Sequence, residues 1–188
     1  MTKNKNIVVC RSDRLYLSPV DEKHAPALTK WMNDPEIFGH LRDMKMVTTV
    51  EQHLEWVKVA RQSAVDRIFA IYYLSEDQLI GDGGVMKIDW ENRKAEVGLV
   101  IGEKKYQGKG LGKEAVWLLC HYAFQELKLH NLIAEIIGKN EASFRLHEGL
   151  GFKPVGTRRE AIWLGNRWED AHYLDLLPQE LVKPTRVG

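Results

Sequence analysis

The stretch "KKYQGKGLGKEA" (residues 104–115) places three glycines at alternate positions between an apolar run and a helical pattern. A dinucleotide-binding fingerprint would need a glycine in place of Lys113. A Walker loop would need a glycine in place of Gln107 and a Ser or Thr in place of Glu114. The stretch therefore fits neither of the two commonest nucleotide-binding patterns.

A glycine-rich turn that leads into a helix still has a chemical use. It gathers free backbone N–H groups and the positive end of a helix at one spot, which suits an anionic ligand, and Lys109 and Lys113 add positive charge nearby. Glycines also open turns for purely steric reasons. On composition alone, a phosphate site and a flexible turn are equally good interpretations.

The apolar pattern on either side of this stretch changes period several times. Three segments rich in β-branched and aromatic residues, separated by the turn-forming "SEDQ" and "DWENR", predict an antiparallel meander. Helical spacing marks four other segments, and the second of them begins with a capping-box pair at Thr48 and Glu51. The expected strands are 14–20, 67–74, 78–88, 94–101, 131–137, 152–160 and 167–177, and the expected helices are 21–32, 48–62, 112–127 and 141–150. This order predicts a mixed α+β fold.

Length and composition favour a single domain, residues 1–178, followed by a polar tail, residues 179–188. The 27 Lys and Arg residues nearly balance the 26 Asp and Glu residues, and no basic run suited to a nucleic-acid backbone occurs. Cys10 and Cys120 stand apart without CxxC or histidine neighbours, which predicts no disulfide, no metal site and a reduced, cytoplasmic protein. We expect neither a signal peptide nor a membrane span.

Four motifs resemble one enzyme family. "YQGKGLG" matches the Gln/Arg-x-x-Gly-x-Gly/Ala signature of the GNAT superfamily of N-acetyltransferases, between a strand and a helix as in that family. "NEASFRLHEGLGF" (140–152) resembles a later motif of the family. "WMNDPE" (31–36) and "GNRWEDAHYLDLLPQE" (165–180) resemble the branch of ribosomal-protein N-terminal and spermidine acetyltransferases. The resemblance implies a twisted, mostly antiparallel sheet of about six to seven strands, about four helices, and a splayed fourth and fifth strand.

The same resemblance implies acetyl-coenzyme A as the acetyl donor, with no metal. In the family, the glycine loop holds the pyrophosphate and the open strand edge pairs with the pantetheine arm. An asparagine before the later helix also bonds the cofactor, although the Asn140 side chain equally suits a helix cap. The cofactor-binding residues implied here are Leu99, Val100, Ile101, Gln107, Gly108, Lys109, Gly110, Leu111, Gly112, Lys113 and Asn140.

Acetyl transfer to an amine requires a base for the amine and an acid for the departing thiolate. Glu96 lies where several family members carry a catalytic or amine-binding glutamate, although it is equally well explained as a solvated strand residue. Many members place a tyrosine in the later helix as the acid, whereas this chain has His147 there. An imidazolium, with an ordinary pKa of about 6.5, can protonate a thiolate whose conjugate thiol has a pKa of about 8.5. Ser143, one turn earlier, and water are the alternatives.

These features predict an N-acetyltransferase that moves acetyl directly to an amine in a ternary complex. One alternative is a non-catalytic coenzyme A-binding module, because the family's tyrosine is missing. The acceptor is open among protein or peptide N-termini, polyamines, small-molecule amines and amino-sugar nucleotides, and a homodimer is compatible with the family. The segments that line the acceptor side in relatives contain Trp31, Asp34, Phe38, Trp56, Glu160 and Trp163, although each of these residues is equally well explained as core or solvated surface.

Overall fold

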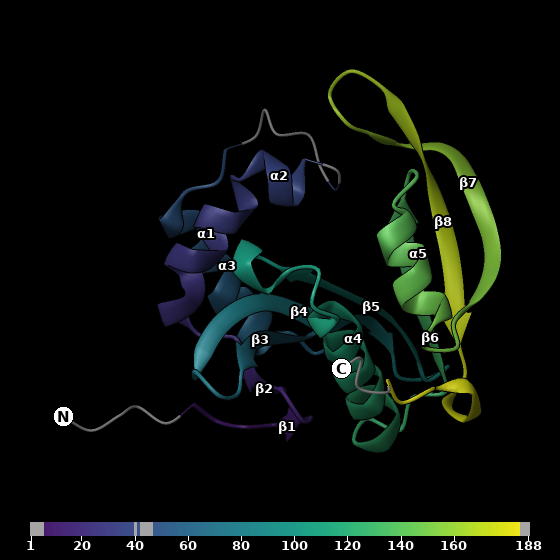
Figure 1. The fold of residues 1–188 in the computed structure, drawn as a ribbon, viewed down its shortest axis with the longest axis horizontal. Coiled ribbons are helices and arrows are strands. Elements are labelled where there is room, and N and C mark those ends of the chain that lie inside the picture. Colours follow the sequence, from purple (N-terminus) through teal and green to yellow (C-terminus); the bar gives the residue numbers. More distant parts are fainter. Residues whose placement is uncertain (1–5, 40, 42–46, 185–188) are drawn as a thin grey trace.

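The structure, a computed structural model, describes residues 6–39, 41 and 47–184. These residues form one sheet of eight strands in the order β1-β2-β3-β4-β5-β6-β8-β7, drawn in Figure 1. All neighbouring strands pair antiparallel except β5 and β6, which pair in parallel. The strands are β1 (Cys10–Arg11), β2 (Leu15–Pro19), β3 (Arg67–Tyr73), β4 (Gln78–Asp89), β5 (Lys94–Ile101), β6 (Asn131–Ile137), β7 (Lys153–Trp163) and β8 (Trp168–Leu176). The predicted mixed fold with a mostly antiparallel sheet is confirmed.

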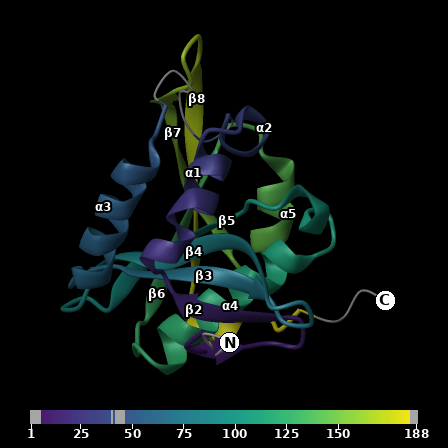
Figure 2. The same ribbon diagram turned by 90° about the vertical axis from the view of Figure 1, so that its left-hand side faces the viewer.

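Five α-helices in the described residues cover the sheet. They are α1 (Ala25–Met32), α2 (Pro35–Phe38), α3 (Val50–Gln62), α4 (Leu111–Gln125) and α5 (Glu141–Glu148). Helices α1, α2 and α3 lie on one face of the central strands, as Figure 2 shows, and α4 lies on the other face. Helix α5 packs beside α4 and β6. The described residues contain no helix that is both long and apolar enough to cross a membrane.

The sequence pattern of α4 explains its position. Ala115, Leu118 and Leu119 recur at helical spacing and are fully buried against strands β2, β3 and β4. Cys120 and Ala123 face the neighbouring part of the core, under β5 and β6. Because α4 is apolar over so wide an arc, it is fixed firmly beneath the sheet.

Strands β5 and β6 diverge soon after they meet. Their parallel pairing covers only residues 94–96 of β5 and 131–133 of β6. Beyond Glu96, β5 continues to Ile101 paired with β4 alone among the described strands. The predicted splay is thus confirmed, and it leaves one edge of β5 at residues 97–101 with unpaired backbone groups.

Two elements exceed the predicted number of strands and helices. Strand β1 has two residues and α2 has four, and neither is long enough to show a period in the sequence. The predicted start of α3 is wrong by one residue, because Thr49 and Gln52 form its capping box. Thr48 is held instead by Asn33, whose side chain bonds its backbone N–H and carbonyl at 2.9 and 2.7 Å.

The described part of the expected tail contacts the domain. A 3-10 helix forms at Pro178–Glu180, and the Val182 N–H donates to the Leu150 carbonyl at 3.0 Å. The Lys183 ammonium lies 5.5 Å from the centre of the Trp117 ring. Residues 185–188 of that tail, and residues 1–5 of the expected domain, lie outside the described residues.

Candidate active site

The glycine loop connects the open strand to α4. After β5 ends at Ile101, a 3-10 helix (Lys104–Tyr106) leads to Gln107, whose side-chain amide donates to the Ile101 carbonyl at 2.7 Å. Gly108 and Gly110 have φ values of 71° and 72°. Residues other than glycine rarely adopt that backbone conformation, and β-branched residues adopt it least of all. The turn into α4 therefore depends on these two glycines.

The start of α4 has the features of an anion site. Gly110 is the residue before the first turn, and among the described residues no side chain caps this helix end. The first N–H groups of an α-helix have no partner within the helix, and here they belong to Leu111, Gly112 and Lys113. The Leu111 side chain is buried in the core, which fixes the backbone of the first turn. These N–H groups and the helix dipole favour a phosphate-type anion.

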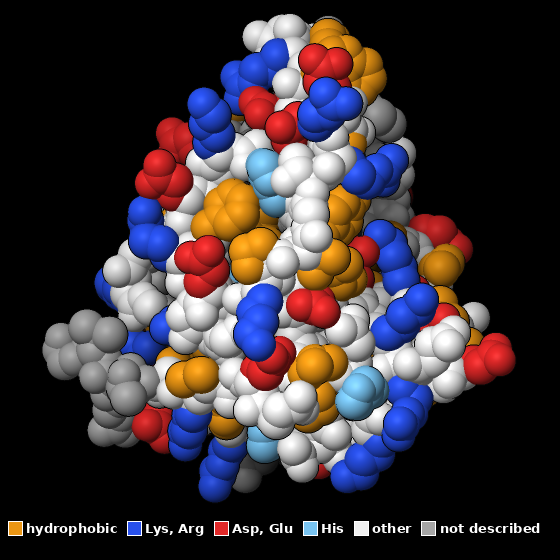
Figure 3. Space-filling model, turned by 90° about the vertical axis from the view of Figure 1, so that its right-hand side faces the viewer, with side chains coloured by type: hydrophobic (Ala, Val, Ile, Leu, Met, Phe, Trp, Pro, Cys, Tyr) orange, Lys and Arg blue, Asp and Glu red, His pale blue; other side chains and the backbone are white. Residues whose placement is uncertain are grey.

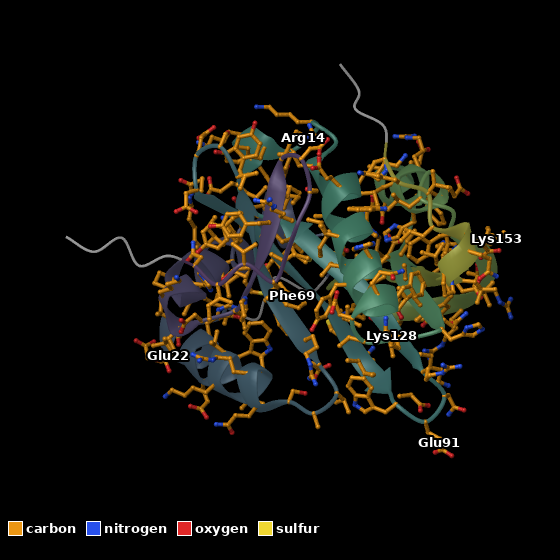
Figure 4. All side chains as sticks on the ribbon, turned by 90° about the horizontal axis from the view of Figure 1, so that it is seen from below. Arg14, Glu22, Phe69, Glu91, Lys128 and Lys153 are labelled. Atoms are coloured by element: carbon orange, nitrogen blue, oxygen red, sulfur yellow. The ribbon has the colours of Figure 1, made fainter. Side chains whose placement is uncertain are left out.

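The first turn of α4 is anchored by residues about 100 positions earlier in the chain. The buried Glu114 carboxylate accepts hydrogen bonds from Arg14 Nε at 2.7 Å, the Arg14 backbone N–H at 2.9 Å and Ser12 Oγ at 2.6 Å. Arg14 also donates to the Lys109 carbonyl at 3.0 Å. Figure 4 shows Arg14 at the beginning of α4 and Lys128 beyond its other end. Sequence reasoning missed Arg14 and Glu114, because nothing local links two segments so far apart.

Two of the predicted loop residues pack α4 against α5. A Cβ on Gly112 would lie 3.3 Å from Leu146 Cδ1, so the glycine allows the two helices to approach closely. The Lys113 ammonium lies beside Gly149, at the end of α5. The Lys109 ammonium lies 5.9 Å from the centre of the Tyr106 ring. Both predicted lysines are therefore near the loop, but on different sides of it.

Asn140 and the open strand edge complete the predicted cofactor residues. The Asn140 side chain caps α5 by accepting the Ser143 N–H at 3.1 Å, which confirms its predicted capping role. It also lines a cavity of about 600 Å³ together with Lys139 and Arg167. The predicted segment Leu99, Val100 and Ile101 is half-buried and lies on the open edge. The edge, the loop and the helix start are thus continuous.

The candidate proton donors lie together on α5. His147 is only 7% exposed, and its Nδ1 lies 2.8 Å from the Ser143 carbonyl and 3.3 Å from Ser143 Oγ. A carbonyl only accepts, so Nδ1 carries the hydrogen. The His147 Nε2 is buried without a partner among the described residues. Burial lowers the pKa of His147 below its ordinary value, which favours the neutral ring.

Glu96 is already engaged by a cation. Its Oε2 lies 2.6 Å from the ammonium of Lys87 on β4, and this hydrogen bond raises the pKa of Lys87. Glu96 lies opposite Met86 on β4 and Ile133 on β6, at the last paired position before the splay. Glu96 therefore lies where β5 is still paired with β6, next to the unpaired segment of β5.

The segments expected to line the acceptor side separate into two groups. Phe38 and Trp56 line a cavity of about 250 Å³ between the helices and β4, while Trp31 is buried in the core and donates to Glu103. Asp34 caps α2 and pairs with Lys104 at 2.8 Å. The two remaining residues, Glu160 and Trp163, lie on β7, across the open edge from the helices, as Figure 1 shows.

Asp82 on β4 is a candidate site residue that sequence reasoning missed. It lines the same cavity as Phe38 and Trp56, and burial raises the pKa of its carboxyl to about 7. Carboxyl groups with a pKa near the working pH are suited to proton transfer and cluster at functional sites. The segment "LIGDGGVMKID" reads as an ordinary strand, so no local signal marked the position.

The outer face of the β7 and β8 region lacks a field of one sign. Figure 3 shows Lys and Arg side chains interspersed with Asp and Glu across this face. Val155, Trp163 and Trp168 are exposed hydrophobic residues of the two strands. This face therefore offers no basic stripe of the kind that binds nucleic acid.

An open strand edge runs to a glycine-bounded helix start, beside a cavity with an unusual carboxyl, and this arrangement suits a ligand that has an extended arm and an anionic end. Residues 14–153 match the model of the acetyltransferase (GNAT) domain, and the chain belongs to this family. It is an N-acetyltransferase, and its acetyl donor is acetyl-CoA. The unpaired edge and the free N–H groups fit the pantetheine arm and the pyrophosphate of that donor.

Three comparisons illustrate the relationship. The uncharacterized N-acetyltransferase p20 of Bacillus licheniformis is 28% identical over 172 residues, which cover 90% of this chain and 96% of that protein. The structure of a GNAT-family acetyltransferase from Bacillus anthracis superposes with a TM-score of 0.78 at 27% identity, covering 90% and 98% of the two chains. The Vibrio cholerae spermidine N-acetyltransferase, solved with CoA and spermine, gives 0.82 at 20% identity, covering 90% and 98%.

Proposed function

We propose that this protein transfers the acetyl group directly from acetyl-CoA to a primary amine, with both substrates bound at once. The observation that carries the proposal is the continuity of the open β5 edge with the start of α4. A ligand that follows the strand reaches the helix N–H groups with its phosphates at one end, while its other end stays beside the acceptor cavity.

The cysteines support direct transfer over a covalent acetyl-enzyme. The chain has two, and burial raises the pKa of Cys10 to about 11 and raises the pKa of the fully buried Cys120 further. A cysteine nucleophile requires the thiolate form in an accessible place. Neither cysteine meets both conditions, so the amine itself is the nucleophile.

The proposed cofactor contacts follow the geometry. Bound acetyl-CoA supplies the thioester that is attacked. Backbone groups of Leu99, Val100 and Ile101 pair with its pantetheine arm, and an N–H of this segment faces the thioester carbonyl. The backbone of residues 107–113 and the Lys109 and Lys113 ammonium groups hold the pyrophosphate, and the Asn140 amide bonds the arm.

Glu96 and α5 supply the remaining proposed roles. Because Glu96 binds the Lys87 ammonium, it is suited to bind or deprotonate a substrate ammonium that displaces Lys87. The neutral state of His147 favours the Ser143 hydroxyl as the group that relays a proton from water to the departing thiolate, with His147 in contact with it. His147 as the direct donor and water alone are the alternatives that mutagenesis separates.

The acceptor is a primary amine of a small molecule or a peptide chain. The Vibrio cholerae spermidine acetyltransferase has a similar fold and binds spermine, which supports an amine carried on an aliphatic chain. Amino-sugar nucleotides remain in the test panel as the competing acceptor class. The protein acts in the cytoplasm, where acetyl-CoA and reduced cysteines are both available.

The experiment is the release of free thiol from acetyl-CoA by the purified protein. The panel contains polyamines, simple alkylamines, amino-sugar nucleotides, amino acids and peptides with varied N-termini. Acceptor-dependent thiol release, with an acetylated amine found by mass spectrometry, is the expected result. Stabilisation by acetyl-CoA without thiol release would support the non-catalytic binding module instead. No stabilisation by acetyl-CoA would contradict the proposed cofactor site.

A further inference from the structure

The cavity beneath the N-terminal helices combines apolar walls with one carboxyl group. It has a volume of about 250 Å³ and lies between α1, α2, α3 and strand β4. Asp82 is the one acidic residue among the described residues that line it. Of the residues that the structure describes, the lining includes Leu28, Met32, Phe38, Thr48, Gln52, His53, Trp56 and Asp82. A site of this kind suits a cation attached to an apolar chain.

The strand register places Asp82 beside the reactive part of β5. Asp82 lies opposite Val100 on β5 and Ala70 on β3. Val100 belongs to the segment with the open edge, whereas Glu96 lies four residues earlier on the strand, or about 13 Å away. Asp82 therefore lies beside the unpaired segment of β5, whereas Glu96 lies where β5 is still paired with β6.

The two carboxylates also differ in their partners. Glu96 is bound to the Lys87 ammonium at 2.6 Å. Among the described residues no side chain makes a hydrogen bond or an ion pair with the Asp82 carboxyl, and its burial raises the pKa to about 7. A half-buried carboxyl without a partner costs folding free energy, so a ligand that supplies a positive charge would be bound strongly.

We propose that this cavity binds the acceptor as a primary ammonium on a short aliphatic chain, and that the Asp82 carboxylate, rather than Glu96, takes its proton. This inference rests on the proposed acetyl transfer and names its acceptor class. An N–H bond of the ammonium breaks and an O–H bond forms on Asp82. The freed lone pair then bonds to the thioester carbonyl carbon, and the C–S pair leaves with the thiolate. The second amine proton passes to the sulfur, and Asp82 returns its proton to solvent.

The size of the cavity limits the acceptor. At about 250 Å³, the cavity is smaller than the about 300 to 1,000 Å³ typical of ligand pockets, which suits a small acceptor. A chain of four or five carbons with its ammonium fits that space, while a nucleotide does not. The faces of Phe38 and Trp56 suit the ammonium and its first methylene groups. The cavity thus favours an alkylamine over an amino-sugar nucleotide.

Few titratable groups compete with Asp82 in this cavity. Strands β3 and β5 contribute the uncharged Ala70 and Val100 on either side of it. Helices α1 and α2 contribute only uncharged side chains. The remaining titratable group among the described residues of the lining is His53 on α3, whose Nδ1 lies 2.9 Å from Thr29 Oγ1. Among the described residues that line the cavity, a titrating carboxyl can therefore be assigned to Asp82.

The test compares Asp82→Asn with the wild type, using n-butylamine as the acceptor. Loss of a general base lowers rates by about 10² to 10⁴, so we expect kcat/KM for n-butylamine to fall at least about 100-fold. The affinity for acetyl-CoA is expected to stay unchanged, which shows that the variant folds. Glu91→Gln, in the exposed β4–β5 turn labelled in Figure 4, removes one carboxylate elsewhere and serves as the control. An unchanged kcat/KM in Asp82→Asn would overturn the proposal.

A second measurement does not require turnover. In ¹³C-labelled wild-type protein, the Asp82 carboxyl is expected to titrate near neutral pH, and n-butylammonium chloride is expected to shift the titration to lower pH. An Asp82 titration near the ordinary pKa of about 4, or one unaffected by the amine, would sink the proposal. Because this readout needs no acetyl-CoA, it separates a failure of the amine site from a failure of the acetyl-transfer function.

Discussion

The two sides of the open β5 edge present different chemical groups, with backbone on one side and side chains on the other. The proposed cofactor side consists of backbone: an unpaired strand edge, two glycines with positive φ, and the first N–H groups of α4. The proposed acceptor side consists of side chains that converge from α1, α2, α3 and β4 on one cavity. A backbone site accepts the part of a cosubstrate that never varies, whereas a side-chain site can change its specificity one residue at a time.

The largest expected effect lies on the backbone side, in Gly110→Val. A β-branched residue strains the left-handed conformation at φ 72° and covers the N–H groups of the first turn. We expect the affinity for acetyl-CoA, measured by titration calorimetry, to fall about 100-fold, or about 2.7 kcal/mol.

Gly156→Val provides the matched control for this substitution. Gly156 lies on the exposed strand β7, and a Cβ there would meet nothing within 4 Å. We expect this variant to bind acetyl-CoA as the wild type does. Equal affinities in the two variants would show that the glycine loop does not hold the cofactor.

A smaller effect is expected where side chains support the backbone site, in Glu114→Gln. Breaking a buried ion pair costs about 3 to 5 kcal/mol, and the partial exposure of Arg14 reduces the loss here to about 2 kcal/mol of unfolding free energy. Chemical denaturation measures it. The exposed pair of Glu141 and Arg145 is the control, since Glu141→Gln should cost less than about 0.5 kcal/mol. Similar losses in both variants would contradict an anchoring role for Glu114.

The same difference between backbone groups and side chains also explains which features could be predicted from the sequence. The glycine loop is a contiguous motif, the splayed strand is implied by the family resemblance that this motif carries, and the structure confirms the fold built on them. Arg14 and Glu114 meet across about 100 residues, and Asp82 joins Phe38 and Trp56 only after three helices pack on the sheet. Contacts of that kind leave no periodic signal. The exchange of Thr48 for Thr49 at the start of α3 has the same origin, because Asn33 is distant in sequence.

On the proposed acceptor side, we expect Asp82→Asn to change the free energy of unfolding in a way that depends on pH. The folded-state pKa of Asp82 is raised to about 7, above the ordinary value of about 4, so the folded state binds the extra proton between these values. The protonated Asp82 carboxyl therefore contributes to the free energy of unfolding at low pH, and this contribution is lost as the pH rises through 7. Since Asp82 is only half-buried, we expect Asp82→Asn to be more stable than wild type by about 2 kcal/mol at pH 8.5, with a smaller gain at pH 5.

Denaturant titrations at the two pH values check this prediction, with Glu91→Gln as the control for removal of a surface carboxylate. A gain in stability that does not depend on pH would mean that Asp82 is ionised throughout and that burial does not perturb it. Such a result would also remove the proton-acceptor role from the acceptor cavity.

The smallest effect is expected on α5, in Ser143→Ala, where the two sides meet. If the Ser143 hydroxyl relays the proton to the thiolate, kcat should fall about fivefold, or about 1 kcal/mol, with the affinity for acetyl-CoA unchanged, because water can replace the relay.

The variant His147→Asn tests the competing assignment, because it keeps a donor near the position of Nδ1 and removes the buried Nε2. A larger fall in kcat for His147→Asn, with loss of the alkaline limb of the pH profile, would identify His147 as the acid instead. The lowered pKa of His147 argues against that outcome, since the ring would then carry the required proton only below its ordinary pKa of about 6.5.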